Sequence, residues 1–288
     1  MSEVALVAAY ALRESLRRRV FLVVLILTTL FLVLYTVGAI FAFDDLESGP
    51  AAQFGVGDLV DERQLRGSTI LGLAMFSTLF LGAVLAVFLT MGAVRGDADQ
   101  GLLQPMVVRP LGRTQLLAGR FAAAAAVCAA YAAAVYLLAM LITGVVGDWW
   151  PDRVLGPALG LAAGVVVIAA LSLLGSVFLS ATANGIAVFM VFGAGLAAGL
   201  LGQIGEALDS ASLSRVAEVV SLALPFEALY QAGLAGLTAD AGGITGAVVE
   251  LGPFGGAQEF GPMLWPWAVV YVLLVGLAAR AGFARRDL

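Results

Sequence analysis

The chain has 288 residues, of which 61% are hydrophobic and 12% charged, and its net charge is −5. Soluble domains contain roughly 45–50% apolar and roughly 25% charged residues, so this composition excludes a soluble globular protein. The sequence has no histidine and no lysine, which excludes imidazole bases, P-loop phosphate binding and Schiff-base chemistry. Its single cysteine, Cys128, lies in an alanine-rich stretch and is predicted to be a core residue.

The first element, residues 1–19, has a mainly apolar first half and carries the arginines Arg13, Arg17, Arg18 and Arg19. This pattern favours an elbow-like helix in the cytoplasmic membrane interface, with arginines at lipid phosphates. Periodicity equally allows these residues to begin a long first membrane helix. The following apolar run is about twice as long as the apolar region of a signal peptide and lacks a cleavage site, so we expect it to be retained.

Six apolar stretches are long enough to cross a membrane, because a bilayer core of roughly 30 Å needs roughly 20 residues of helix. None of them contains a charged residue or a histidine. They comprise residues 20–43, 69–94, 121–146, 154–180, 185–203 and about 263–279. The sequence therefore predicts an all-α membrane protein with six transmembrane helices in a single transmembrane domain, residues 1–288.

The loop at residues 95–120, between the second and third stretches, is short but organised. An acidic pair precedes a turn, an apolar strip follows, and a second element leads into the third span. In that order, its main residues are Asp97, Asp99, Gly101, Leu103, Met106, Val107, Pro110, Arg113, Gly119 and Arg120. A loop in water has no reason to carry this much apolar surface, so we expect the strip to dock on the membrane, on this chain or on a partner.

Glycines recur at four-residue spacing in two of the later spans. The fourth span holds Gly156, Gly160 and Gly164, and the fifth holds Gly195 and Gly199. Such glycine faces let helices approach closely. We expect them to serve packing within one chain rather than a seam between two copies, because six helices offer more internal contacts.

The outer region, residues 204–262, contains a stretch that is apolar enough for a seventh span but includes Glu218, Glu227 and the helix breaker Pro225. We predict two short helices broken near Pro225 that dip into or lie on the outer leaflet. Pro225, Phe226 and Glu227 form the candidate outer gate or re-entrant element. Trp265 and Trp267 then anchor the last span at the outer interface.

Arginines give the orientation when the loops are assigned alternately to the two sides. The side of the N-terminus holds eleven arginines and five acidic residues, and the other side holds four arginines and fifteen acidic residues. Positive charge favours the cytoplasmic side. We therefore expect a multi-pass protein of a prokaryotic plasma (inner) membrane with both termini in the cytoplasm.

The spacing from Asp97 to Arg120 resembles the ABC-2 type permease family. Members of that family carry an acidic-x-acidic-x-Gly-Thr-Leu run, followed at fixed distances by proline, arginine and a glycine with a basic residue. In this chain Leu102 replaces the threonine, and aspartates replace the glutamates. Less specific features extend the resemblance over the chain, at residues 16–21, 224–227 and 283–288.

The resemblance implies a permease subunit of an ATP-driven transporter, of the exporter type. Loop 95–120 would form a coupling helix in a groove of a separate ATP-binding subunit, present in two copies, and two permease subunits would pair as a homodimer or heterodimer. ATP would be bound by that partner, so this chain would need no cofactor or metal and would not be an enzyme. The partners would include membrane lipids and no nucleic acid.

Within the loop, the resemblance implies that polar side chains orient it, apolar ones fill the partner groove, and Gly101 and Pro110 fix its bends. The polar set is Asp97, Asp99 and Arg113, and the apolar set is Leu103, Met106 and Val107. A solvated acidic pair beside ordinary turn residues remains the alternative.

Two other functional classes compete with this interpretation. A membrane scaffold or carrier that works without ATP is the first, although an ion-coupled carrier needs titratable groups at mid-membrane depth, which the predicted spans lack. An intramembrane enzyme is the second, but the sequence has no HExxH motif and no serine or cysteine beside a base. An uncharged path suits lipids, apolar drugs or peptides, and the sequence does not choose among them.

Overall fold

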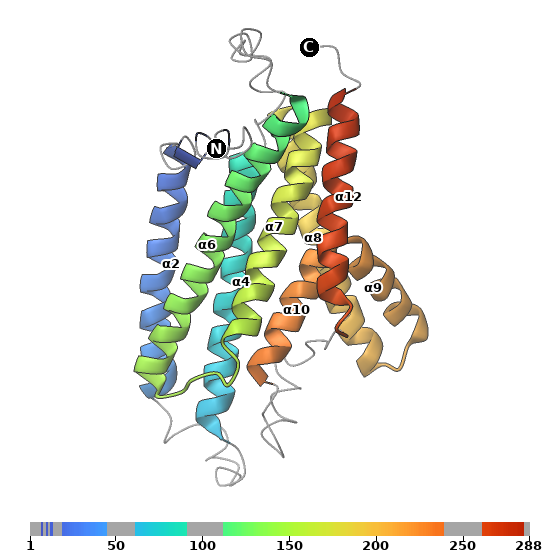
Figure 1. Ribbon diagram of the computed structural model, residues 1–288. Helices are drawn as coiled ribbons and strands as arrows, with labels where there is room; N and C mark the ends of the chain where they lie inside the picture. The colour runs from blue at the N-terminus through green and yellow to red at the C-terminus, as the bar shows by residue number, and fades with distance from the viewer. Residues whose placement is uncertain are drawn as a thin grey trace.

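The computed structural model describes residues 7, 10, 12, 13, 19–44, 61–90, 112–238 and 261–284. Over these ranges the chain is helical throughout, with short connections and no strand. Figure 1 shows a bundle of long, nearly parallel helices with two shorter ones, α9 and α10, on one side of its lower half. The helices are α2 (Arg19–Asp44), α4 (Glu62–Thr90), α6 (Arg113–Gly147), α7 (Leu155–Phe178), α8 (Ala181–Ala207), α9 (Ala211–Ala223), α10 (Pro225–Thr238) and α12 (Leu264–Ala284).

Six of these helices are long and apolar enough to cross a membrane: α2, α4, α6, α7, α8 and α12. This confirms the six predicted spans and the all-helical class. Helices α9 and α10 pass the same test only as a pair, bent by 107° at the break between them. The predicted break near Pro225 is therefore confirmed.

Helix α7 lies at the centre of the bundle, in contact with α4, α6, α8, α10 and α12. The core is formed mainly by the inward residues of α4, α6, α7 and α10, while α2 and α12 expose wide apolar faces such as those of Leu34 and Leu273. Cys128 is buried in this core, as predicted. Exposed leucines on the outer helices are favourable in a membrane, because lipid acyl chains solvate apolar side chains.

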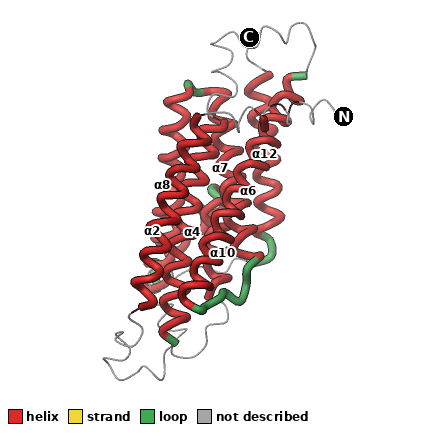
Figure 2. The backbone as a smooth tube through the Cα atoms, turned by 90° about the vertical axis from the view of Figure 1, so that its left-hand side faces the viewer, coloured by secondary structure: helices red, strands yellow, loops and turns green. Residues whose placement is uncertain are grey.

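The helix ends fall at two levels, which Figures 1 and 2 show from two sides. A small buried cluster joins the start of α6, the end of α7 and the end of α12, through Leu117, Val177 and Phe283 among others. At the opposite level the start of α4 meets the end of α6, where Arg63 and Asp148 form an ion pair of 3.2 Å. Consecutive spans therefore run in opposite directions, as six crossings require.

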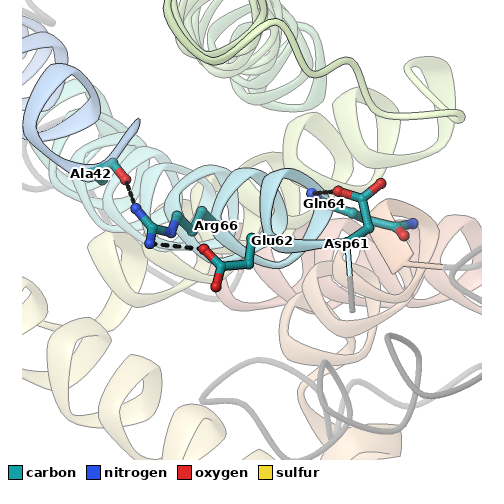
Figure 3. A network of polar contacts seen from close by, with 5 residues as sticks. All are labelled: Ala42, Asp61, Glu62, Gln64 and Arg66. Atoms are coloured by element: carbon teal, nitrogen blue, oxygen red, sulfur yellow. Dashed lines mark hydrogen bonds and ion pairs between the residues drawn. The ribbon is translucent and has the colours of Figure 1, made fainter. Parts of the chain in front are cut away.

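Helix α4 begins at Glu62, seven residues before the span predicted to start at position 69. Figure 3 shows why the polar residues at this end are helical. The Asp61 carboxylate accepts a hydrogen bond from the backbone N–H of Gln64 at 3.0 Å, the geometry of an N-cap. Arg66 pairs with Glu62 at 3.0 Å and donates to the carbonyl oxygen of Ala42 at the end of α2. Hydropathy predicted the start of this helix too late, because it counts polar residues as unfavourable and takes no account of the hydrogen bonds and ion pair that they form here.

The fifth span also begins earlier than predicted. Residues 181–184 were expected to be a link between spans, but α8 starts at Ala181 and only positions 179 and 180 connect it to α7. The Asn184 amide is buried and donates to the carbonyl oxygen of Ser172 at 2.9 Å. This hydrogen bond spans the tight connection and engages the Nδ2 of Asn184, while its Oδ1 has no hydrogen-bond partner among the described atoms.

Helix α2 contacts the bundle along one narrow face. Two hydroxyl pairs join it to α6: Thr28 with Tyr131, and Tyr35 with Thr143. All four residues are buried. In an apolar surrounding a hydrogen bond between side chains fixes the relative position of two helices, because an unpaired hydroxyl there is costly.

The predicted interfacial helix at residues 1–19 lies largely outside the described residues. Of its arginines, Arg13 is exposed, Arg19 is the first residue of α2, and Arg17 and Arg18 are not described. The interfacial role of this segment remains a prediction.

Candidate functional site

The most unusual feature of the bundle is the bend between α9 and α10 (Figure 1). Leu224 separates the two helices, and Pro225 is the first residue of α10. Proline is favoured at a first helical position because its missing N–H has no intrahelical acceptor there. The proline that ends α9 thus also starts α10, and it turns the chain by 107°.

Four of the predicted glycines make room for α10: Gly160, Gly164, Gly195 and Gly199. An added Cβ would lie 2.6 Å from the carbonyl oxygen of Leu229 at Gly160, and 3.1 Å from that of Phe226 at Gly164. At Gly195 it would lie 2.4 Å from the Phe226 ring. Glycines on α7 and α8 thus let α10 approach the backbone of both helices, which confirms their predicted role in packing within one chain. Gly156 is different, since a Cβ there would meet nothing within 4 Å.

Phe226 is fully buried and belongs to a chain of ring contacts over three helices. Its ring stacks on Phe192 of α8, with centroids 5.7 Å apart and planes inclined by 14°. Phe192 contacts Phe80 of α4 at 6.1 Å, and Phe80 contacts Phe189 at 6.4 Å. This aromatic chain leads from the bend to Phe80, which is 44% exposed on the bundle surface. Of these four phenylalanines, only Phe226 was predicted from the sequence. Contacts between different helices do not produce a regular spacing along the chain, so the other three could not be recognised.

An open apolar groove of about 580 Å³ lies beside this aromatic chain, between the end of α4 and the start of α8. Val87 and Phe88 line it from α4, and Phe189 lines it from α8. Phe189 thus belongs to both the groove and the aromatic chain, which makes the two features continuous.

Glu227 is 2% exposed and is the acidic residue closest to the bend. The side chain of Gln231, one turn later on α10, hydrogen-bonds to its carboxyl group. The Oε1 atoms of both residues have no hydrogen-bond partner among the described atoms. No ion pair joins Glu227 to an arginine in the part of the chain that the structure describes. The bend therefore holds a buried acid and amide in an otherwise apolar contact, where polar groups are costly and usually serve a function.

The second candidate region, loop 95–120, is described only from Gly112 onwards. Asp97, Asp99, Gly101, Leu103, Met106, Val107 and Pro110 lie outside the described residues. Arg113 is the first residue of α6, Gly119 is buried in its second turn, and Arg120 is half-buried. The element predicted to open at Gly112 and Arg113 is therefore the beginning of the third span itself.

The start of α6 is capped by a residue that the sequence interpretation missed. The backbone N–H of Gly112 donates to Oε1 of Gln115 at 2.9 Å, and the N–H of Gln115 donates to the carbonyl oxygen of Gly112 at 2.9 Å. A glutamine three residues into a helix that bonds back to the cap residue is one half of a capping box. Gln115 thus fixes the point at which the loop becomes a helix.

The tryptophans expected to anchor the last span occupy the first turn of α12. Trp265 is 41% exposed, and Trp267 donates from Nε1 to the carbonyl oxygen of Leu222 at 3.0 Å. Leu222 precedes the bend by two residues, so this bond ties α12 to the end of α9. Trp267 therefore has a structural contact in addition to its predicted place at the interface.

Comparison with known proteins bears on the whole chain. A family model described as ABC-2 family transporter protein matches residues 5–288. Comparison with curated proteins gives no significant match. The match agrees with the spacing of loop 95–120 and with the six apolar helices. The chain therefore belongs to the ABC-2 transporter family, and it is an integral membrane protein of the permease type.

Proposed function

We propose that this chain is the membrane subunit of an ATP-driven exporter, in which a separate ATP-binding subunit hydrolyses ATP and moves the spans. The observation that carries the proposal is α6, a single helix of 35 residues from Arg113 to Gly147. At 1.5 Å per residue it is about 50 Å long, which exceeds the thickness of a bilayer core. A force applied to its first turn is therefore delivered along the full length of the bundle.

Packing supports a route from α6 to the bend at Pro225. Helix α6 packs on α7, and α7 contacts α10 through Gly160 and Gly164. Glycine contacts bring backbones together without flexible side chains between them, so a shift of α7 carries α10 with it. We propose that the bend, with Phe226 and Glu227, is the element that changes shape at the outer side.

Loop 95–120 is proposed as the contact with the ATP-binding subunit. Its apolar residues would enter a groove of that partner, and Asp97, Asp99 and Arg113 would orient it. Two ATP-binding subunits and two permease subunits would form the complete transporter, with ATP bound only by the partner. The cytoplasmic side would be the level at which α6 begins and α12 ends.

The test is purification of the tagged chain after co-expression with an ATP-binding subunit of the same family, encoded next to it. The proposal expects the two proteins to co-purify and ATP-dependent transport to require both. A chain that works in vesicles without any ATPase would instead be the alternative, a carrier or scaffold independent of ATP.

The orientation of the chain in the membrane can be tested by labelling introduced cysteines. The only native cysteine, Cys128, is buried and should not interfere. A cysteine introduced as Gly112→Cys should react with a membrane-impermeant maleimide in inverted vesicles and not in intact cells. The matched Asp152→Cys variant, at an exposed position of the other level, should show the reverse. Equal labelling from the same side would overturn the proposed topology.

A further inference from the structure

A second groove lies between the start of α6, the second half of α7 and residues 272–280 of α12. Its volume is about 380 Å³, and its lining is almost entirely apolar, with Phe121 of α6, Leu173 of α7 and Leu277 of α12 among its larger residues. A Cβ on Gly276 would meet nothing within 4 Å, so this glycine leaves the groove open towards the surroundings of the bundle. An apolar groove of this size that opens sideways has the shape for a hydrocarbon chain.

Arg280 lines the same groove at one end, four residues after Gly276 on α12. Its side chain is exposed, and no ion pair or hydrogen bond engages it within the described ranges. Thr114, in the first turn of α6, is the other polar residue of the lining. The groove is thus apolar along its length and carries a cation at its end.

The depth of Arg280 fits the level of lipid headgroups. Trp265 marks the other end of α12, and the 15-residue separation corresponds to roughly 22 Å of helix. A bilayer core is roughly 30 Å thick, and a long arginine side chain reaches towards the interface while its stem stays in apolar surroundings. With Trp265 at one interface, a guanidinium group at this depth therefore has the reach to contact the headgroups at the other.

We propose that this groove binds an anionic phospholipid, with one acyl chain along Phe121, Leu173 and Gly276 and the phosphate at Arg280. Net negative charge is favoured over a zwitterionic headgroup, because the segments assigned to this side carry eleven arginines and five acidic residues. The bound lipid bridges the end of α12 and the first turns of α6. It therefore stabilises the part of α6 that follows the loop at 95–111, whether or not that loop contacts an ATPase.

The experiment is native mass spectrometry of the detergent-purified chain titrated with phosphatidylglycerol or phosphatidylcholine. Wild-type protein should bind phosphatidylglycerol more tightly, and Arg280→Gln should weaken that binding by about fivefold, which corresponds to one basic residue at a membrane surface. The matched control Arg153→Gln, an exposed arginine at the other level, should leave binding unchanged. Glycerol phosphate, which lacks acyl chains, should not bind measurably.

A second variant tests the groove itself. Gly276→Leu fills the opening and should weaken binding of both lipids, whereas its thermal stability without lipid should be unchanged or higher because leucine favours a helix more than glycine does. Gly38→Leu, at a glycine of α2 that also has open space around it, is the control. Equal affinity of wild-type protein for both lipids, or unchanged binding in Arg280→Gln and Gly276→Leu, would overturn the proposal.

Discussion

The Oε1 atom of Glu227 faces the backbone of Gly199, so closely that a Cβ on this glycine would lie 2.0 Å from it. The contact joins the buried carboxyl group at the bend to the last third of the fifth span, α8. It exists because α8 has no side chain at position 199 and α10 has a buried glutamate two residues after Pro225. Polarity and close helix packing thus coincide at one point of the bundle.

Replacing Gly160 by alanine should destabilise the fold, because the new Cβ would lie 2.6 Å from the backbone carbonyl oxygen of Leu229 and must push α10 away from α7. Overpacking of this kind lowers the free energy of unfolding by about 1–3 kcal/mol. Gly193→Ala is the control, since a Cβ there meets nothing within 4 Å and alanine gains up to about 1 kcal/mol of helix stability. Unfolding in detergent followed by circular dichroism measures both, and equal stability of the two variants would contradict the packing described for α7 and α10.

Glu227→Gln should fold normally, with a change of less than about 1 kcal/mol in stability, because an amide keeps the size of the carboxyl group and a hydrogen bond to Gln231. Glu227→Lys should destabilise the protein strongly, since it places a cation in an apolar contact without an acidic partner.

Glu218→Lys provides the control for the charge change, because Glu218 is exposed on α9. Its thermal midpoint should stay close to that of the wild type. A Glu227→Lys protein as stable as Glu218→Lys would mean that the carboxyl group at the bend is accessible to water.

Trp267→Phe should loosen α12 from the end of α9, because it removes the 3.0 Å hydrogen bond from Nε1 to the carbonyl oxygen of Leu222. The loss of one such bond costs about 0.5–1.5 kcal/mol. Trp265→Phe should cost less, since the Trp265 indole has no hydrogen bond among the described residues and is 41% exposed. Chemical unfolding of the two variants side by side measures the difference, and a larger effect of Trp265→Phe would argue against this contact.

Arg113→Glu should reduce recovery of a co-expressed ATP-binding subunit and abolish ATP-dependent transport, because it reverses the charge at the junction of the loop and α6. The double change of Gly101 and Pro110 to alanine should act in the same way, because these two residues are predicted to fix the bends of the loop. Thermal stability of the isolated chain should be unchanged in both, since the proposed role of these residues is contact with the partner subunit.

The control for the loop variants is Arg153→Glu, at the other level of the bundle, which should leave recovery and transport unchanged. Normal ATP-dependent transport by the Arg113→Glu protein would remove this residue from the proposed coupling contact.

Much of the architecture was predictable because it depends on local properties of the chain. Apolar runs of membrane length identified the six spans, and Pro225 with its neighbouring glutamates identified a broken pair of helices. The spacing of the loop from Asp97 to Arg120 led to the ABC-2 family, which the match over residues 5–288 confirms. The residues of that loop before Gly112 lie outside the described ranges, so their role in coupling remains a prediction.

Sequence alone thus determined the membrane class, the number of spans, the bend and the family. Hydropathy, proline geometry and motif spacing are local properties, so they can be read from neighbouring residues in the sequence. Only the tertiary structure decided that α10 fills the space left by Gly160, Gly164 and Gly199, and that Arg66 and Asn184 belong inside helices. Those outcomes depend on which helices become neighbours, and a pattern within one helix does not specify the partner across the bundle. The apolar groove at Arg280 arises in the same way, from three helices that are far apart in the sequence.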